Sequence, residues 1–295
     1  MSGMTTSTDY YVDDTIGPHG GHLTGDPPPR TPSDAIVTKI SAGGDTVHWS
    51  TYLGSYHQDE ARELALDQYQ NVYVTGWTNS SYFQGNDFPG ATNTSYGDTD
   101  VFLAKLSYTG QLATGYNRYF GGSGSDVPSS IAVTPSGKAF IVGRTSSNNL
   151  PGSDTGYGTP FQNTYTGNTD GFVASFNVYG GGGYRTYLGG DNRDGVTRIT
   201  LSGDTAWVCG YTWSSNFAKT DPGTLPGLHG SYQGNRDGFA MAINPLGTNY
   251  VYATFVGGGG SDTAHGIALT PDGACWVTGV TTTSPFEPSP INSYD

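Results

Sequence analysis

The stretch "YFGGSGSD" at residues 119–126 decides the fold, because three more copies of it occur along the chain. The other copies are "YLGSYHQD", "YLGGDNRD" and "FVGGGGSD", which begin at residues 52, 187 and 255. In each copy an aromatic residue precedes glycine, and an aspartate ends the segment. Glycine gives a backbone the freedom that a tight turn needs, and aspartate accepts hydrogen bonds from turn N–H groups. The pattern therefore predicts four turns between strands.

The segments that follow each copy also repeat. A short apolar strand such as "SIAV" comes next, followed by a turn and by an aromatic strand that ends in glycine, such as "AFIVG". A longer loop rich in Gly, Pro, Ser and Thr then leads to an element that begins with aspartate, such as "DVFLAKL". The units begin near residues 34, 100, 170 and 237, so the period is 66 to 70 residues. Four short strands repeated in this way indicate a β-propeller.

We predict an all-β chain with one β-propeller over residues 34–295, in four blades of four antiparallel strands. The apolar segment has a small residue at its centre, which suits the crowded innermost strand. On this assignment the chain opens with the third and fourth strands of a blade and ends with the first and second strands of one. We predict that these N- and C-terminal half-blades join as the last blade. The alternative is pairing between subunits, which would build a filament.

The repeated pattern, from "D-x-F-V-A-K-L" through "Y-L-G-G" to "Y-V-T-G", resembles the bacterial and archaeal β-propeller repeat named SBBP. The resemblance extends over residues 34–295. It implies the propeller fold, usually with more blades than the four repeats found here. It implies no particular chemistry, because such repeats occur in surface-exposed, secreted and adhesin-like proteins of differing function.

Composition excludes several classes of partner. The 295 residues carry a formal net charge of -13, and no basic stripe offsets it, so the chain would repel a nucleic-acid backbone. No stretch approaches the length of a membrane span, and no signal peptide is visible. We predict a soluble chain with no nucleic-acid partner and no membrane insertion. The two cysteines, Cys209 and Cys275, are expected to be free thiols because strand alternation points them to opposite faces.

Residues 1–33 precede the repeats and have the composition of an extended arm or linker. Within them "DYYVDD" is the strand-like patch, so Tyr10, Tyr11 and Val12 are candidates for adding to a neighbour's sheet edge. The alternative is a disordered leader.

The repeated aspartates have two interpretations. As a rim of carboxylates they would bind calcium. Apart from this possible calcium, we predict no cofactor. As turn residues they would accept backbone hydrogen bonds, which we favour because every repeat has the residue and a binding site needs to exist only once. The residues are Asp59, Asp126, Asp194 and Asp262.

Residues that break the repeat are the better candidates for ligand contact. Exposed aromatic side chains among Asn, Asp and Ser suit sugar stacking or a protein contact, although they also cover sheet edges. The candidates are Tyr56, His57, Trp77, Tyr82, Tyr157 and Trp213. By contrast, the aromatic residues that recur in every second strand indicate core between blades; they are Tyr73, Phe140, Trp207 and Trp276. Asn79 and Asn93 match the glycosylation pattern.

No catalytic motif stands out, and we predict no catalytic residue. We predict a non-enzymatic structural or binding subunit of an extracellular, cell-surface or virion assembly, such as a fibre, filament, tail or surface layer. Its partners would be copies of itself, neighbouring subunits or glycans. The alternatives are a soluble lectin-like propeller and a propeller hydrolase or lyase.

Overall fold

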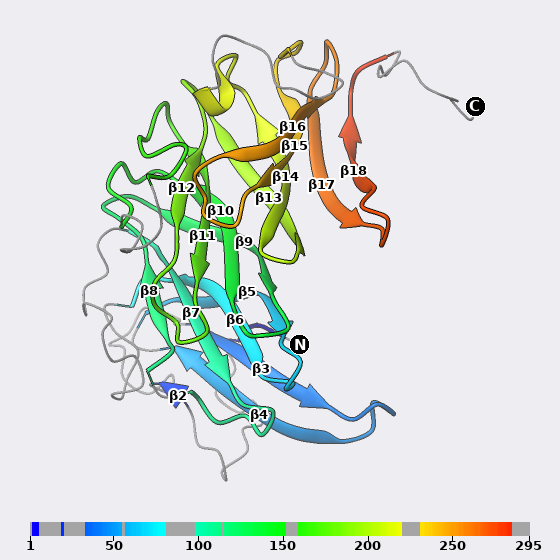
Figure 1. Cartoon of the computed structure of the whole chain (residues 1–295). Coiled ribbons are helices and arrows are strands. Elements are labelled where there is room, and N and C mark those ends of the chain that lie inside the picture. Colours follow the sequence, from blue (N-terminus) through cyan, green and yellow to red (C-terminus); the bar gives the residue numbers. More distant parts are fainter. Residues whose placement is uncertain are drawn as a thin grey trace. The chain divides into compact units, whose positions relative to one another are not determined.

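The structure is a computed structural model that describes residues 2–5, 19–20, 33–54, 57–80, 98–113, 115–151, 159–219 and 231–284. The described part of the chain is all β apart from one short 3-10 turn, Phe217–Lys219. The chain divides into two compact units. The first comprises residues 1–139, 149–151 and 176–181, and the second comprises residues 140–148, 152–175 and 182–295. Figure 1 shows the strands, coloured along the sequence.

The first unit contains one complete four-stranded blade. Its strands pair antiparallel in chain order, as the repeat predicts; they are β5 (Asp59–Leu66), β6 (Val72–Thr78), β7 (Asp100–Leu106) and β8 (Arg118–Phe120). The register of β5 on β6 shifts between Ala61 and Glu63, which marks a β-bulge. Strand β9 (Asp126–Val133) begins the following repeat.

The first unit also contains a sheet built on the opening half-blade. Strands β3 (Asp34–Ile40) and β4 (Val47–Gly54) form the predicted hairpin. Two segments from residues 1–33 extend it. Strand β1 (Ser2–Thr5) pairs antiparallel with β3, and β2 (His19–Gly20) pairs parallel with β4. The predicted assembly segment Tyr10–Val12 lies outside the described residues.

The second unit holds the later repeats. Strands β10 (Ala139–Thr145), β11 (Asp170–Phe176) and β12 (Arg185–Leu188) lie side by side in one sheet. Another complete blade follows, again antiparallel and in chain order; it comprises β13 (Asp194–Ser202), β14 (Thr205–Thr212), β15 (Asp237–Ile243) and β16 (Tyr250–Val256). Strands β17 (Asp262–Leu269) and β18 (Cys275–Thr281) form a hairpin.

The predicted joining of the two half-blades into one sheet is not found among the described strands. Strand β3 has β1 on one side and β4 on the other, while β17 and β18 form a sheet of two strands. Strand β1 lies along the edge of β3 that the prediction assigned to β18. The all-β repeat fold is confirmed, and closure of a ring stays a prediction.

Two of the second-strand aromatic residues, Tyr73 and Phe140, lie in the core as predicted, and Trp207 is half-buried. Each contacts a ring in the fourth strand of its repeat or just before it, with ring centroids 5.3 Å apart for Tyr73 and Tyr116, 6.2 Å for Phe140 and Tyr184, and 5.7 Å for Trp207 and Tyr252. Trp276 is the exception. Its side chain is 66% exposed, because no third and fourth strand follow β18 in its sheet.

One backbone hydrogen bond recurs at four places and joins each third strand to the first strand of the next repeat. The N–H of the first-strand aspartate donates to the carbonyl that precedes the third-strand aspartate. The four bonds run from Asp59 to Ser33, from Asp126 to Thr99, from Asp194 to Thr169 and from Asp262 to Arg236, with lengths of 2.6–2.8 Å. We call this arrangement, with its two aspartates, the aspartate clasp.

The glycine at the end of each fourth strand lies against a clasp aspartate, and Gly54 and Gly121 each lie against both aspartates of their clasps. A Cβ atom on Gly121 would collide with the carboxylate of Asp100 and lie 2.9 Å from Asp126 Oδ2. Next to it, the N–H of Gly122 donates to Asp126 over 2.7 Å, and matching bonds run from Gly190 to Asp194 and from Gly258 to Asp262. The glycines at 119–126 therefore serve a turn, as the sequence predicts.

We predict that Gly121→Ala lowers the free energy of unfolding by about 1–3 kcal/mol, the usual cost of overpacking a buried position. Gly259→Ala is the matched control, because a Cβ at Gly259 meets no atom within 4 Å and the equivalent position of another repeat is Ser123. Urea unfolding of both variants measures the difference. Equal stabilities of the two variants would contradict the clasp geometry.

Candidate functional site

The four candidate metal ligands lie in the clasps, where hydrogen bonds hold their carboxylates. Besides the turn N–H groups, hydroxyls donate to them: Ser80 to Asp59, Ser214 to Asp194 and Thr283 to Asp262, over 2.8–3.0 Å. No three His, Cys, Asp or Glu residues come together as a metal-binding group in the described ranges. These contacts support the interpretation as turn residues, and calcium binding by Asp59, Asp126, Asp194 or Asp262 stays a prediction.

Asp34 is the least stabilised of the clasp carboxylates. It is fully buried, and neither of its oxygens has a hydrogen-bond partner among the described residues. Burial and the neighbouring charge of Asp59 raise the pKa of Asp34 to about 8. In the equivalent clasp, burial raises the pKa of Asp237 to about 6, with a smaller contribution from Asp262, while a backbone hydrogen bond from Gln233 opposes the rise. Asp34 is therefore protonated at neutral pH.

We predict that Asp34→Asn stabilises the protein at alkaline pH. An aspartate in the unfolded chain ionises near pH 4, whereas folded Asp34 keeps its proton to about pH 8, so its contribution to stability is lost as pH rises between these values. Asparagine does not titrate, and its amide can donate to Asp59. The melting temperature of Asp34→Asn should exceed that of the wild type by several degrees at pH 8, with the difference shrinking towards pH 4.

Asp45→Asn serves as the control, because the pKa of Asp45 is lowered whereas that of Asp34 is raised. Asp45 is fully exposed, and a hydrogen bond from the Ser41 hydroxyl lowers the pKa of its carboxyl. Its replacement should bring no gain in stability at pH 8. If Asp34→Asn and the wild type lost stability in parallel as pH rises, the assignment of a raised pKa to Asp34 would be wrong.

The candidate aromatic residues do not form one site in the described structure. Trp77 is half-buried in the first unit, and Trp213 belongs to the second unit, where its side chain is 39% exposed. The guanidinium of Arg193 lies 6.0 Å from the centre of the Trp213 ring. The backbone N–H of His57 donates to Ser80 Oγ, so His57 belongs to a turn. Tyr56, Tyr82 and Tyr157 lie outside the described residues.

Of the two glycosylation candidates, Asn79 is exposed, and Asn93 lies outside the described residues.

Both cysteines are free thiols, as predicted; Cys209 is buried and Cys275 is half-buried. Burial raises the pKa of Cys209 to about 11, although a hydrogen bond with Thr197 opposes the shift. Cys209 is therefore an unreactive thiol at neutral pH.

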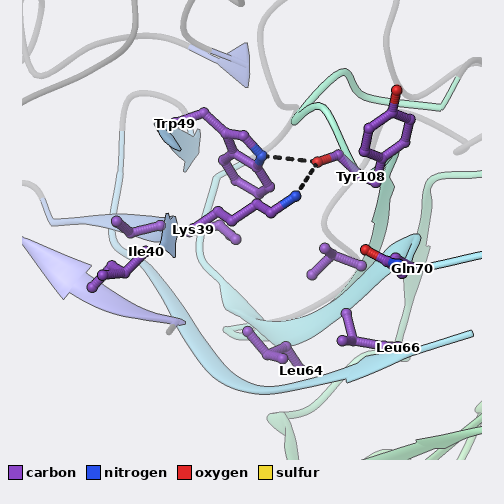
Figure 2. A pocket seen from close by; sticks show the side chains of 10 residues that line it. Lys39, Ile40, Trp49, Leu64, Leu66, Gln70 and Tyr108 are labelled. Atoms are coloured by element: carbon purple, nitrogen blue, oxygen red, sulfur yellow. Dashed lines mark hydrogen bonds between the residues drawn. The ribbon is translucent and has the colours of Figure 1, made fainter. Parts of the chain in front are cut away.

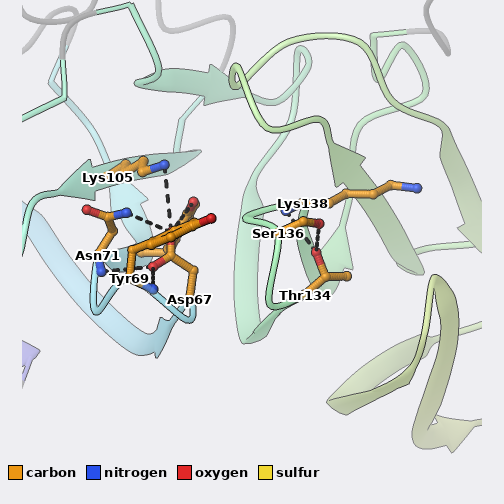
Figure 3. A network of polar contacts seen from close by, with 8 residues as sticks. Asp67, Tyr69, Asn71, Lys105, Thr134, Ser136 and Lys138 are labelled. Atoms are coloured by element: carbon orange, nitrogen blue, oxygen red, sulfur yellow. Dashed lines mark hydrogen bonds and ion pairs between the residues drawn. The ribbon is translucent and has the colours of Figure 1, made fainter.

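In a buried polar cluster of the first unit, the carboxylate of Asp67 is hydrogen-bonded by neighbouring groups of the fold (Figure 3). Its carboxylate accepts hydrogen bonds from the backbone of Tyr69 and Asn71 and from the Tyr73 hydroxyl, and Lys105 Nζ lies 3.9 Å away. Burial opposes ionisation, but these hydrogen bonds outweigh it and hold the pKa of Asp67 below its usual value. The cluster fixes a turn, and the equivalent turn at Thr134 is held by a hydroxyl instead.

A hollow of about 240 Å³ lies in the first unit beside β3 (Figure 2). Aliphatic side chains from β5 and the ring of Trp49 line it. Two donors at its wall share one acceptor, because Trp49 Nε1 and Lys39 Nζ both donate to the carbonyl of Tyr108, over 3.0 and 3.1 Å. With its polar groups paired, the hollow presents an apolar surface suited to a hydrophobic side chain.

A second hollow, of about 410 Å³, lies on the β17–β18 hairpin in the second unit. It is lined by Val256 of β16 and by residues of β17 and β18, including Asp262 and Gly279. Strand β18 pairs only with β17 among the described strands, so its other edge is open. In Figure 1 it is the outer strand of the hairpin. Sequence reasoning predicted this edge but assigned β3 to it. The β18 edge with its hollow in the second unit and the hollow beside β3 in the first unit are two separate candidate sites.

Repeated four-stranded sheets in chain order, joined by the aspartate clasp, define a β-propeller repeat protein. The family model described as SBBP beta-propeller repeat matches the chain at residues 48–83 and 116–151. These two segments are thus similar to the SBBP repeat, in agreement with the sequence resemblance. Each match contains the first-strand aspartate of a clasp, Asp59 or Asp126, while the third-strand aspartate lies before the match. No curated protein matches the chain.

Proposed function

We propose that this protein is a non-enzymatic structural and binding subunit of an extracellular, cell-surface or virion assembly, such as a fibre, filament, tail or surface layer. The open edge of β18 carries the proposal. An unpaired strand edge presents N–H and C=O groups that pair readily with a strand from another molecule. In this role the repeats form a stiff scaffold, and the strand edges join subunits.

The exposure of apolar residues along β18 supports a joining role. Trp276 and Val280 are exposed there, although strands of complete blades bury most of their apolar side chains. Soluble proteins blunt an open edge with charged residues or proline, and β18 has neither in "CWVTGVT". The described part of the chain contains no helix long and apolar enough to cross a membrane.

We predict that the wild type forms oligomers whose mass rises with protein concentration and that Val280→Lys suppresses them. A lysine on an edge strand opposes strand addition. Leu246→Lys is the matched control, because Leu246 is 51% exposed in a turn of the same unit and Val280 is 50% exposed. Light scattering over a concentration series measures the mass, and thermal melts check that both variants fold.

Salt provides a second arm of the same experiment. Copies with a net charge of -13 repel one another, so added salt should strengthen the association by screening. A wild-type chain that stays monomeric at every concentration and salt level would overturn the proposed self-assembly.

A lectin-like role is the second candidate, and the contact between Trp213 and Arg193 favours it. An exposed indole beside a cation offers an apolar face and hydrogen-bond donors to a sugar. We predict that a glycan ligand changes tryptophan fluorescence in the wild type and that Trp213→Ala abolishes binding, with Tyr179→Ala as an exposed aromatic control. A broad glycan panel without any binder would remove this candidate.

A further inference from the structure

Strand β1 holds the place of a second strand on β3. It pairs Thr5 with Asp34, as β6 pairs Thr78 with Asp100 and β14 pairs Thr212 with Asp237. Its sequence "SGMT" matches the ends of those strands, "TGWT" and "CGYT". This signal was available in the sequence, although the segment is too short to show a strand period.

The match is incomplete in length. Strand β1 pairs with four residues of β3, Asp34–Val37, whereas β6 and β14 each pair with seven residues of their third strands. Among the described strands, none other than β4 lies beside the second half of β3. The hollow of about 240 Å³ lies along this half, since Lys39 and Ile40 line it (Figure 2).

The hollow lies beside an aromatic residue that has lost its counterpart. Trp49 stands five residues before the glycine that ends the fourth strand, as Tyr116, Tyr184 and Tyr252 do in the other repeats. Each of those three tyrosines contacts the aromatic residue of a second strand. The strand next to β3 is β1, and its described pairing with β3 stops at Val37, before the position of such an aromatic residue.

The missing counterpart has the position of Trp276. This residue stands three residues before the glycine of its strand, as Tyr73, Phe140 and Trp207 do. It is largely exposed, and among the described strands none but β17 pairs with β18. Three aromatic pairs are thus complete, and the fourth is left as two separate halves.

The hollow on β17–β18 lies where complete blades have a side chain from the third strand. In complete blades a ring from the third strand lies against the glycine of the second strand. A Cβ on Gly76 would come within 2.6 Å of the Phe102 ring, and one on Gly210 within 2.9 Å of the Phe239 ring. Gly279 is the equivalent glycine, and it borders the hollow. Ile36 is the equivalent third-strand residue of β3.

We propose that β18 of one copy pairs with β3 of a second copy and displaces β1 from it. The register is that of the complete blades, from Thr281 opposite Asp34 to Cys275 opposite Ile40. Trp276 enters the hollow beside Trp49, and Ile36 lies over Gly279. This inference rests on the proposed self-assembly and names its partner strand.

Strand exchange makes the association depend on protein concentration, because pairing with β18 requires the release of β1 from β3. Seven residue pairs replace four, and an exposed tryptophan becomes buried, so the exchanged state gains contacts. The cost is the release of β1, which lowers the tendency to assemble at low concentration. The contact is head-to-tail, and it leaves one β18 and one β3 open at the ends of each oligomer, so it propagates.

A cross-link at the predicted register tests the proposal. Ile40→Cys would face native Cys275 at a distance that a disulfide spans, since paired strands place opposite Cα atoms about 4.5–5.5 Å apart. Oxidation of concentrated protein should give a ladder of reducible oligomers on a denaturing gel. Val47→Cys is the control, because Val47 pairs with Ile40 on the far side of β3 and is also exposed. Wild type gives the background.

The outcomes are distinguishable. A ladder for Ile40→Cys alone supports the exchange. A cross-linked monomer would show that the same chain's β3 fills the site, and this would overturn pairing between copies. Absence of a cross-link while light scattering still shows oligomers would overturn the inference but leave the proposed assembly intact. Absence of both would overturn both.

Two further variants test the roles of Trp276 and β1. Trp276→Ala should raise the concentration needed for assembly about tenfold or more, as loss of a buried aromatic anchor does, whereas Trp213→Ala should not. Removal of residues 2–5 should lower that concentration, because β3 is then uncovered. Assembly that is weakened by this truncation would mean that β1 does not compete with β18.

Discussion

The structure depends on the aspartate clasp, the hydrogen bond from the N–H of a first-strand aspartate to the carbonyl that precedes a third-strand aspartate. It joins each repeat to the next at four places with nearly constant length. Two carboxylates are buried at each clasp, and such a pair is tolerated only when hydrogen bonds or a proton offset the charge. The glycine turns, the hydroxyl donors and the raised pKa of Asp34 all follow from that requirement.

The regular pattern of clasps and aromatic pairs is interrupted at the two half-blades, β3–β4 and β17–β18. Three of the four repeats form their aromatic pairs, two of them buried and one half-buried, whereas Trp49 and Trp276 belong to half-blades. Strand β1 covers part of one half-blade, and nothing among the described strands covers the edge of the other. The proposed function therefore lies in the interruption of the repeat, and the repeated residues serve the fold.

Repetition is also what made the fold predictable from the sequence. Strands such as Ala139–Thr145 lie where the pattern "AFIVG" indicates them, because four copies of one pattern reinforce one another. The same repetition gave no indication that residues of the two half-blades differ in burial from their equivalents. Trp276 looks identical to Tyr73 in sequence, yet its exposure depends on a neighbouring strand that periodicity takes for granted. The raised pKa of Asp34 likewise depends on burial and on the neighbouring charge of Asp59, which the spacing of the repeat does not reveal. Strand β1 was missed because four residues carry no hydrophobic period.

Hydrogen–deuterium exchange at low and high protein concentration tests the central claim most directly, because it reports on both strands in the unmodified chain. The account predicts that amides of residues 275–281 become protected as concentration rises, while those of residues 2–5 lose protection. Protection of residues 275–281 that does not change with concentration, or that rises while residues 2–5 stay protected, would contradict strand exchange between copies.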